Sequence, residues 1–193
     1  MGGETLPMQV VATKIEAVKI ITQRRFYDDR GFFEEIFNSQ RFKEHGLECD
    51  FVQDNHSYSR EVGAIRGLHF QTPPFAQDKL VGCPRGALLD VAVDLRSGSA
   101  TYGQYVCEEL TPENGRQLFV PIGFAHGFCT LKPDTEITYK VSNYYAPDHD
   151  AGIAWNDSDL AIKWPVSSGD AKLSEKDQRL PFLKNAPEAF PIV

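Results

Sequence analysis

An arginine and a histidine stand three residues apart in the segment 63–71, GAIRGLHFQ, which is otherwise apolar enough to form a buried strand. Histidine has an ordinary pKa close to neutrality, so His69 is a natural group for proton transfer. Arginine pairs well with anionic or carbonyl-bearing ligands, which suits Arg66 to binding a substrate. The plain structural alternative is one buried histidine bonded to backbone, with Arg66 at a strand end. The segment is therefore a candidate site that other parts of the chain must support.

Polar groups recur inside apolar strand patterns elsewhere. Five further segments share this property: 30–35 (RGFFEE), 53–55 (QDN), 79–81 (KLV), 123–128 (GFAHGF) and 139–140 (YK). Each segment also has a purely structural explanation. Arg30 and Glu35 could form an exposed ion pair, which would contribute little to stability, and Phe33 or Tyr139 could simply pack in a core. In the strand expected at 51–59, however, the odd-numbered positions from 53 onward are all polar and share one face. That face suits a ligand pocket or solvent.

The elements that would position these residues are mostly strands. Short apolar or alternating runs, separated by turn residues, predict strands at 18–23, 32–37, 51–59, 65–71, 79–83, 88–96, 105–110, 117–120, 127–131 and 136–144. The turn-type cluster at 28–31 predicts a hairpin between the first two. Helical signals are limited to 39–45 and 174–177, the latter with Ser174 as N-cap. Many short strands predict an all-β sandwich or barrel with a few short helices, in which a jelly roll is one arrangement.

Composition limits the classes of function. A chain of 193 residues, 41% hydrophobic and 24% charged, fits one soluble domain over residues 1–193, with 1–7 expected as a tail. The net charge of −7 argues against a nucleic-acid or polybasic membrane binder. No apolar run approaches the roughly 18 residues of a membrane helix. Because residues 1–7 lack signal-peptide features, and the spacing of the four cysteines matches no zinc pattern, we expect a cytoplasmic protein with reduced thiols.

The order of these motifs resembles the dTDP-4-dehydrorhamnose 3,5-epimerase family, from about Ile15 to Pro181. The motifs that carry the resemblance are RGFFEE at 30–35, QDNHS at 53–57, RGLHFQ at 66–71, KLV at 79–81, DVAVDLR at 90–96, PIGFAHGF at 121–128, YK at 139–140, WND at 155–157 and LSEKD at 173–177. Each motif is short, but their collinear succession is specific. The resemblance implies a cupin-type jelly roll, a homodimer, and a site inside the mouth of the barrel.

Many cupins bind a metal through a His-x-His pair, a glutamate and a later histidine. Here Phe70 and Gln71 follow His69, so the pair is missing. His69 and His126 alone would supply two nitrogen ligands, which is too few for a typical zinc site. We therefore expect no catalytic metal and no cofactor.

The resemblance implies a dTDP-4-keto-6-deoxy sugar as substrate, with epimerisation at C3 and C5 that leads to dTDP-4-dehydro-L-rhamnose in L-rhamnose biosynthesis. By resemblance, His69 is the base and Asp177 its carboxylate partner. Tyr139 matches the opposing acid, and a phenol with an ordinary pKa near 10 is a proton donor at neutral pH. Lys79 matches the residue beside the developing oxyanion, where a fixed charge accelerates the reaction.

The resemblance also assigns substrate contacts. The positions that match contacts to nucleotide, diphosphate or sugar are Arg30, Phe33, Glu35, Gln53, Asn55, Arg66, His126 and Tyr144. Arg66 raises a geometric difficulty, because strict strand alternation places it on the face opposite His69. A bulge at Gly67 would bring both inward. Otherwise Arg66 would reach the site from an edge or across a dimer interface.

Other readings remain open at this point. Relatives that epimerise only C3 or only C5 would carry the same histidine and tyrosine, and a 3,4-ketoisomerase could use the same barrel. From other classes come a metal-dependent cupin oxygenase and a non-catalytic module that binds nucleotide sugars.

Overall fold

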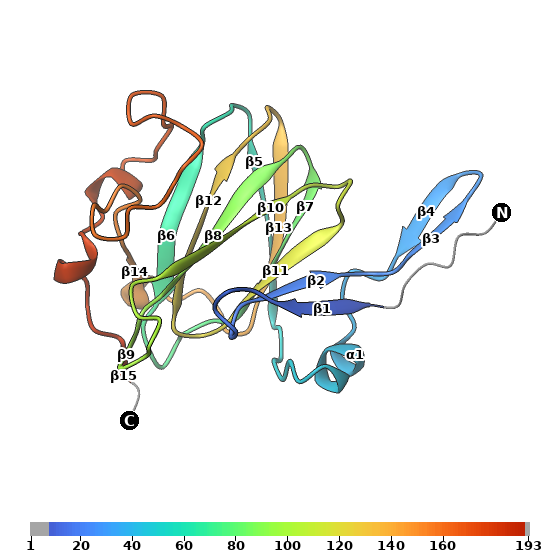
Figure 1. Cartoon of the computed structure of the whole chain (residues 1–193), viewed down its shortest axis with the longest axis horizontal. Coiled ribbons are helices and arrows are strands. Elements are labelled where there is room, and N and C mark those ends of the chain that lie inside the picture. Colours follow the sequence, from blue (N-terminus) through green and yellow to red (C-terminus); the bar gives the residue numbers. More distant parts are fainter. Residues whose placement is uncertain (1–7, 192–193) are drawn as a thin grey trace.

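Two antiparallel sheets face one another in the computed structural model, which describes residues 8–191 (Figure 1). The six-stranded sheet has the order β1 (Gln9–Ala12), β2 (Lys19–Thr22), β11 (Arg116–Val120), β7 (Lys79–Arg85), β13 (Thr135–Val141), β5 (Gln53–Ser59). The five-stranded sheet has the order β10 (Tyr105–Leu110), β8 (Leu88–Asp94), β12 (Phe124–Thr130), β6 (Ile65–Gln71), β14 (Asp150–Gly152). This arrangement confirms the predicted all-β, cupin-type jelly roll. The tail expected at 1–7 lies outside the described residues.

The remaining elements are short. They are the hairpin β3 (Arg25–Asp28) and β4 (Gly31–Glu34), the parallel pair β9 (Arg96–Ser97) and β15 (Phe190–Pro191), the helix α1 (Ser39–Glu44), and the 3₁₀ turns η1 (Pro147–His149), η2 (Asp177–Arg179) and η3 (Leu183–Asn185). The side chain of Asn38 caps α1 by accepting from the backbone N–H of Gln40 and Arg41. Within residues 8–191, no helix is long and apolar enough to cross a membrane.

The main core lies between the sheets. Val81, Leu118 and Ile137 from the six-stranded sheet pack with Leu88 and Phe128 from the five-stranded sheet. A second cluster covers the outer face of the five-stranded sheet, where the C-terminal segment packs over it at the left of Figure 1; its members include Leu68, Val91, Val93, Ile153 and Phe190. Both faces of this sheet are therefore buried, which explains why its strands read as nearly continuous apolar runs.

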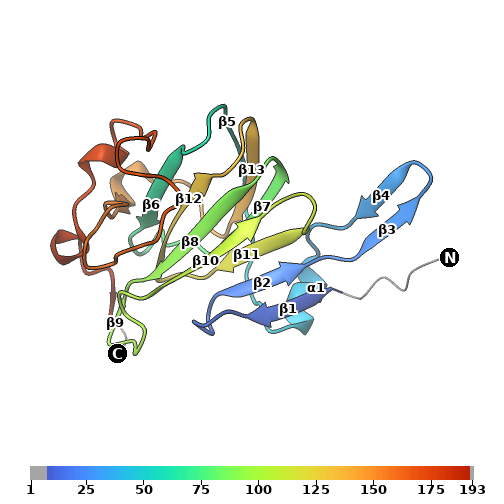
Figure 2. The same cartoon turned by 45° about the horizontal axis from the view of Figure 1, so that its top comes forward.

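The predicted hairpin was wrong in one of its strands. The turn at 28–31 does join two paired strands, but they are β3 and β4, with Asp28 opposite Gly31. Residues 19–22 instead form β2, which pairs with β1 and β11 in the large sheet. In Figure 2 the β3–β4 hairpin projects from the body of the protein, well away from β6 and β12. This projection removes its residues from the barrel of their own chain.

β7 also runs further than predicted. The predicted strand stops at 83, just before Pro84, yet β7 continues to Arg85, which pairs with Glu136 of β13 across a register shift. The pairing of β7 with β11 stops earlier, at Gly82. Pro84 therefore lies beyond the residues of β7 that pair with β11. Its missing N–H costs no hydrogen bond to that strand, and strands tolerate proline at such positions.

Candidate active site

A bulge in β6 brings Arg66 and His69 to the same side of the sheet. His69 pairs with His126 and Arg66 with Phe128, so two residues of β6 stand opposite the single residue Gly127 of β12. Gly67 has a φ of +122°, a conformation that side chains with a Cβ rarely adopt. Both side chains consequently line one cavity, which resolves the difficulty posed by strict alternation.

We predict that Gly67→Ala is strongly destabilising. A Cβ at this position would lie 2.6 Å from the Cα of Gly127 and 2.7 Å from the carbonyl oxygen of His126, and neither backbone atom can move aside freely. We expect a loss of about 2–4 kcal/mol in the free energy of unfolding, measured by urea denaturation. Gly169→Ala is the control, because a Cβ there meets only the Ser167 hydroxyl at 3.9 Å. Equal stability of the two variants would contradict the bulge as the reason for glycine.

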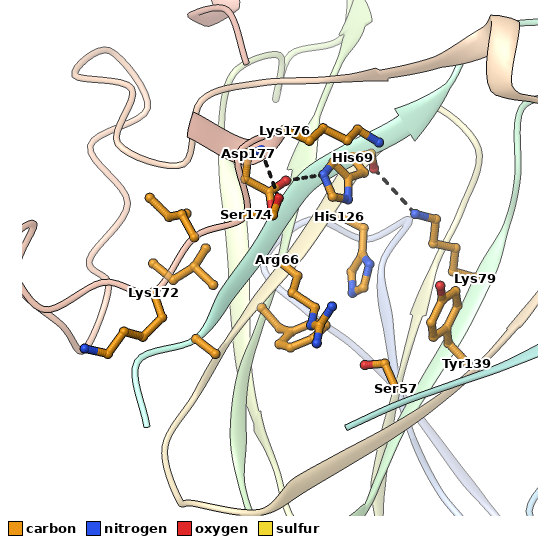
Figure 3. A pocket seen from close by; sticks show the side chains of 14 residues that line it. Ser57, Arg66, His69, Lys79, His126, Tyr139, Lys172, Ser174, Lys176 and Asp177 are labelled. Atoms are coloured by element: carbon orange, nitrogen blue, oxygen red, sulfur yellow. Dashed lines mark hydrogen bonds and ion pairs between the residues drawn. The ribbon is translucent and has the colours of Figure 1, made fainter. Parts of the chain in front are cut away.

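The cavity has a volume of about 470 Å³ and lies between the two sheets (Figure 3). Such a volume suits a small organic ligand. The residues of this cavity that carry polar groups are Ser57, Arg66, His69, Lys79, His126, Tyr139, Lys172, Ser174, Lys176 and Asp177. A second cavity of about 390 Å³ shares His69, Lys79, Tyr139 and Lys176 with the first. The two cavities therefore adjoin at these four residues, all of which have titratable side chains.

His69 and Asp177 form a tight pair although they lie 108 positions apart in the chain. Nε2 of His69 lies 2.5 Å from Oδ1 of Asp177. Burial raises the pKa of the Asp177 carboxyl, but hydrogen bonds from His69 and Ser174 outweigh it and hold that pKa below its usual value. An ionised carboxylate can only accept, so Nε2 carries the proton and Nδ1 keeps a free lone pair. The pair therefore presents His69 as a base.

Tyr139 lies on the wall opposite His69. It belongs to β13 of the six-stranded sheet, whereas His69 belongs to β6 of the five-stranded sheet, and both side chains line the same cavity. Burial raises the pKa of the Tyr139 phenol, an effect that the positive charge of Arg66 partly opposes. The phenol is therefore protonated at neutral pH and can donate a proton from the side opposite the base.

Lys79 is the buried cation of the site. Its side chain is only 8% exposed, and Nζ lies 3.5 Å from the backbone oxygen of His69. Burial lowers the pKa of the Lys79 ammonium to about 8, although the charges of Asp90 and Asp150 oppose the shift. A positive charge in such a dry place interacts strongly with any negative charge that develops on a ligand.

We predict that activity falls as the pH rises through about 8, because Lys79 then loses its charge. Replacing Asp90 by asparagine removes a charge that favours the ammonium, so the fall should begin at a lower pH. The measurement is the pH profile of kcat/KM. Asp54→Asn is the control, since this carboxylate is exposed and pairs with Lys140 instead. Identical alkaline limbs in the two variants would count against charged Lys79 as the active form.

His126 forms a second buried pair with a carboxylate. Its Nε2 lies 2.8 Å from Oδ1 of Asp90, and Oδ2 of Asp90 has no hydrogen-bond partner. His126 lines the main cavity beside His69, its register partner on the neighbouring strand. The carboxylate fixes the orientation of the His126 ring, which suits this residue to a polar contact with a ligand.

The other predicted contacts divide into three groups. Gln53 and Asn55 line the second cavity and bond to each other, with Nε2 of Gln53 2.8 Å from Oδ1 of Asn55. Arg66 lines the main cavity and is anchored by donating to the backbone oxygen of Tyr58 at 3.1 Å. Tyr144 is 63% exposed and lines neither cavity, whereas its neighbour Tyr145 lines the second. The role given to Tyr144 therefore stays a prediction without support from its position.

The third group, Arg30, Phe33 and Glu35, lies outside both cavities. Arg30 at the hairpin tip has a side chain that is 90% exposed and pairs with Asp28, 2.5 Å between Nη2 and Oδ2. Phe33 is 67% exposed on β4. Glu35 pairs with Arg41 at 3.2 Å. A ligand confined to the two cavities of the same chain would not contact these residues.

Several residues of the site were missed in the sequence. They are Asp90, Asp150, Tyr145, Ser174 as a partner of Asp177, and Lys176, whose Nζ pairs with Asp150. Asp90 carried a signal, since it shares a strand face with buried Ala92 and no exposed face was available to it. Asp150 begins the three-residue strand β14 and the others lie in loops, so no periodicity marks these side chains as inward.

Metal ligands were not expected at this site. Across the described part of the chain, no group of three or more histidine, cysteine, aspartate or glutamate side chains is placed to hold a metal ion. The four cysteines are free thiols, three of them buried.

Comparison with known proteins identifies the family. The family model described as dTDP-4-dehydrorhamnose 3,5-epimerase matches residues 12–185. The enzyme of that name from Sinorhizobium fredii is 50% identical over 194 residues, which cover 100% of this chain and 99% of its own. A crystal structure of the Bacillus anthracis enzyme with TDP and PPi bound is 52% identical, with a TM-score of 0.87 over 91% of this chain and 99% of that chain. The Legionella pneumophila dTDP-6-deoxy-D-glucose-3,5-epimerase, in complex with dTDP-4-keto-L-rhamnose, is 41% identical, with a TM-score of 0.91 over 96% and 98%. The chain therefore belongs to the dTDP-4-dehydrorhamnose 3,5-epimerase family.

Proposed function

We propose that this protein epimerises C3 and C5 of dTDP-4-dehydro-6-deoxy-D-glucose, without a cofactor, to give dTDP-4-dehydro-L-rhamnose. The observation that carries the proposal is the placement of a carboxylate-backed histidine and a protonated tyrosine on facing walls of one cavity. Inversion at carbon needs a base on one face of the sugar and an acid on the other, and this site has both. The relatives named above carry the same 3,5 specificity in their names.

The chemistry follows from the C4 ketone, which acidifies the protons on C3 and C5. Nδ1 of His69 takes one of these protons, and the electrons of the broken C–H bond move to the ketone oxygen as an enolate. The Lys79 ammonium stabilises that oxyanion. Tyr139 then returns a proton from the opposite face, which inverts the carbon and leaves a phenolate. His69 then releases its extra proton to solvent, and the Tyr139 phenolate takes up a proton from solvent. The cycle repeats at the second carbon.

Proton NMR of the substrate in deuterium oxide tests the proposal. Loss of the C3 and C5 proton signals at enzyme-dependent rates is expected, with the product in the inverted configuration. dTDP-6-deoxyglucose, which lacks the ketone, is the control and should not exchange. Exchange at one carbon alone would replace the proposal with a single-position epimerase, and proton movement between C3 and C4 would indicate a 3,4-ketoisomerase. Binding without any exchange would leave a non-catalytic binding module.

A metal-dependent oxygenase is the alternative from another class of enzyme. It predicts stoichiometric metal in the purified protein and loss of activity on chelation. The acid–base pair on facing walls favours the epimerase, because oxygenase chemistry has no use for it. The cytoplasmic location expected from the sequence stays a prediction, which cell fractionation checks.

We propose further that the protein acts as a homodimer in which the β3–β4 hairpin completes the site of the partner subunit. The hairpin projects from the body of its own chain (Figure 2). It carries four exposed aromatic side chains: Phe26, Tyr27, Phe32 and Phe33. Exposed aromatics in such number are typical of an interaction surface. The resemblance assigns Arg30 and Phe33 to substrate binding, and only a cavity in another chain is open to them.

Mixed dimers test this arrangement. Arg30→Ala and His69→Ala should each be poorly active alone. When the two variants are co-expressed, half of the sites in each mixed dimer receive an intact hairpin and an intact His69, so activity should return. Co-expression of His69→Ala with Tyr139→Phe is the control, because both residues belong to the same cavity. A monomer in sedimentation analysis would refute the dimer, and a dimer without rescue would refute the exchange of hairpins.

A further inference from the structure

Ser174 stands behind the His69–Asp177 pair as a third member. Its hydroxyl donates to Oδ2 of Asp177 at 2.8 Å, while His69 occupies Oδ1 at 2.5 Å. A hydrogen bond from the backbone N–H of Gly67 also favours the ionised carboxylate. The two oxygens of Asp177 are therefore held by different donors, and Figure 3 shows Ser174 and His69 converging on this carboxylate.

The backbone around Asp177 gives its side chain little support of its own. η2 is only three residues long, and between β14 and η2 the chain forms no helix and only one isolated bridge, Ala64 with Lys172. The Ser174 hydroxyl compensates, because it also accepts from the backbone N–H of Asp177 at 3.1 Å. One hydroxyl thus fixes both the backbone and the carboxylate of the same residue.

We propose that Ser174 is a positioning residue, which holds the plane of the Asp177 carboxylate so that Oδ1 meets Nε2 of His69 and keeps Nδ1 free as the base. The proposal rests on the function proposed above. Without the hydroxyl, the carboxylate can turn about its Cβ–Cγ bond, and the His69 ring loses its fixed orientation and tautomer. Proton abstraction then slows, whereas the groups that bind the nucleotide sugar remain in place.

The variants Ser174→Ala and Ser174→Thr test the role, with Ser167→Ala as a matched control. Ser167 makes the same local contact, since its hydroxyl lies 2.6 Å from Oδ2 of Asp170 three residues on, but it lines neither cavity. We expect Ser174→Ala to lower kcat roughly 10- to 100-fold, as loss of a hydrogen bond to a charged group implies, with KM changed less than about twofold. Ser174→Thr, which keeps the hydroxyl, should restore most of the rate, and Ser167→Ala should match the wild type.

A spectroscopic readout separates this proposal from the proposed reaction. A hydrogen bond as short as that between His69 and Asp177 gives a far-downfield proton resonance, which should shift or broaden in Ser174→Ala and persist in Ser174→Thr and Ser167→Ala. This measurement stands even if the wild type does not exchange C3 or C5 protons, in which case only the function fails. An unchanged resonance with normal kcat would overturn the role of Ser174, and so would a rise in KM alone, which would make it a substrate contact. If Ser174→Ala does not fold, Ser174→Cys replaces it, because a thiol is a weak donor of nearly the same size.

Discussion

Exchange of the C3 and C5 protons with solvent is expected to stop in a His69→Ala variant. A positioned general base contributes roughly 10²- to 10⁴-fold to a proton-transfer step, and no other group of the main cavity duplicates His69. Lys79 and Tyr139 are protonated near neutrality, so neither has a free lone pair to act as the base. Nε2 of His126 is hydrogen-bonded to the carboxylate of Asp90. The measurement is the rate of deuterium incorporation at each carbon, followed by proton NMR at neutral pH.

His56→Ala is the matched control for this experiment. His56 also bonds to a carboxylate, with Nε2 3.1 Å from Oε2 of Glu136, but it is exposed and lines neither of the two adjoining cavities. We expect the control to exchange at the wild-type rate. Because one histidine serves both centres, His69→Ala should lose exchange at C3 and C5 together. Retention of exchange at either carbon would show that a second base acts there.

The sequence was most informative where a polar side chain interrupts an apolar strand. β6 and β10 have the predicted bounds, 65–71 and 105–110. His69, Lys79 and Tyr139, from three different strands, line one cavity. Burying a charge or an imidazole without a partner is costly, so such residues are conspicuous in a strand pattern.

The sequence was least informative where geometry depends on contacts between distant segments. The bulge at Gly67 arises from two strands that slip past one another by a residue, and no local pattern reports such a slip. Tyr145, and not Tyr144, lines the second cavity because the chain leaves β13 before this pair, so strand alternation no longer applies. The pairing of Asp177 with His69 likewise joins a loop to a strand, and only the family resemblance anticipated it.

A Tyr139→Phe variant should separate proton removal from inversion. The phenyl ring keeps the shape of the cavity wall but has no proton to donate, so His69 can still form the enolate while the opposite face lacks its acid. The enolate then recovers a proton mainly from the histidine side, where exchange with solvent introduces deuterium without changing configuration. We expect inverted product to fall roughly 10²- to 10³-fold while deuterium incorporation falls far less.

Deuterium incorporation and configuration, measured separately in the same sample, test whether Tyr139 is the acid. Tyr102→Phe is the control, since Tyr102 is exposed and lines neither cavity. Equal loss of exchange and inversion would mean that the phenol is needed to form the enolate, for example by neutralising its oxygen. Normal inversion would move the acid to Lys79, the other titratable side chain that the six-stranded sheet contributes to this cavity. Loss of the Lys79 charge as the pH rises through about 8 lowers the rate with either acid, because it also removes the stabilisation of the oxyanion. The ratio of inversion to deuterium incorporation in Tyr139→Phe, measured below that pH, therefore identifies the group that delivers the proton.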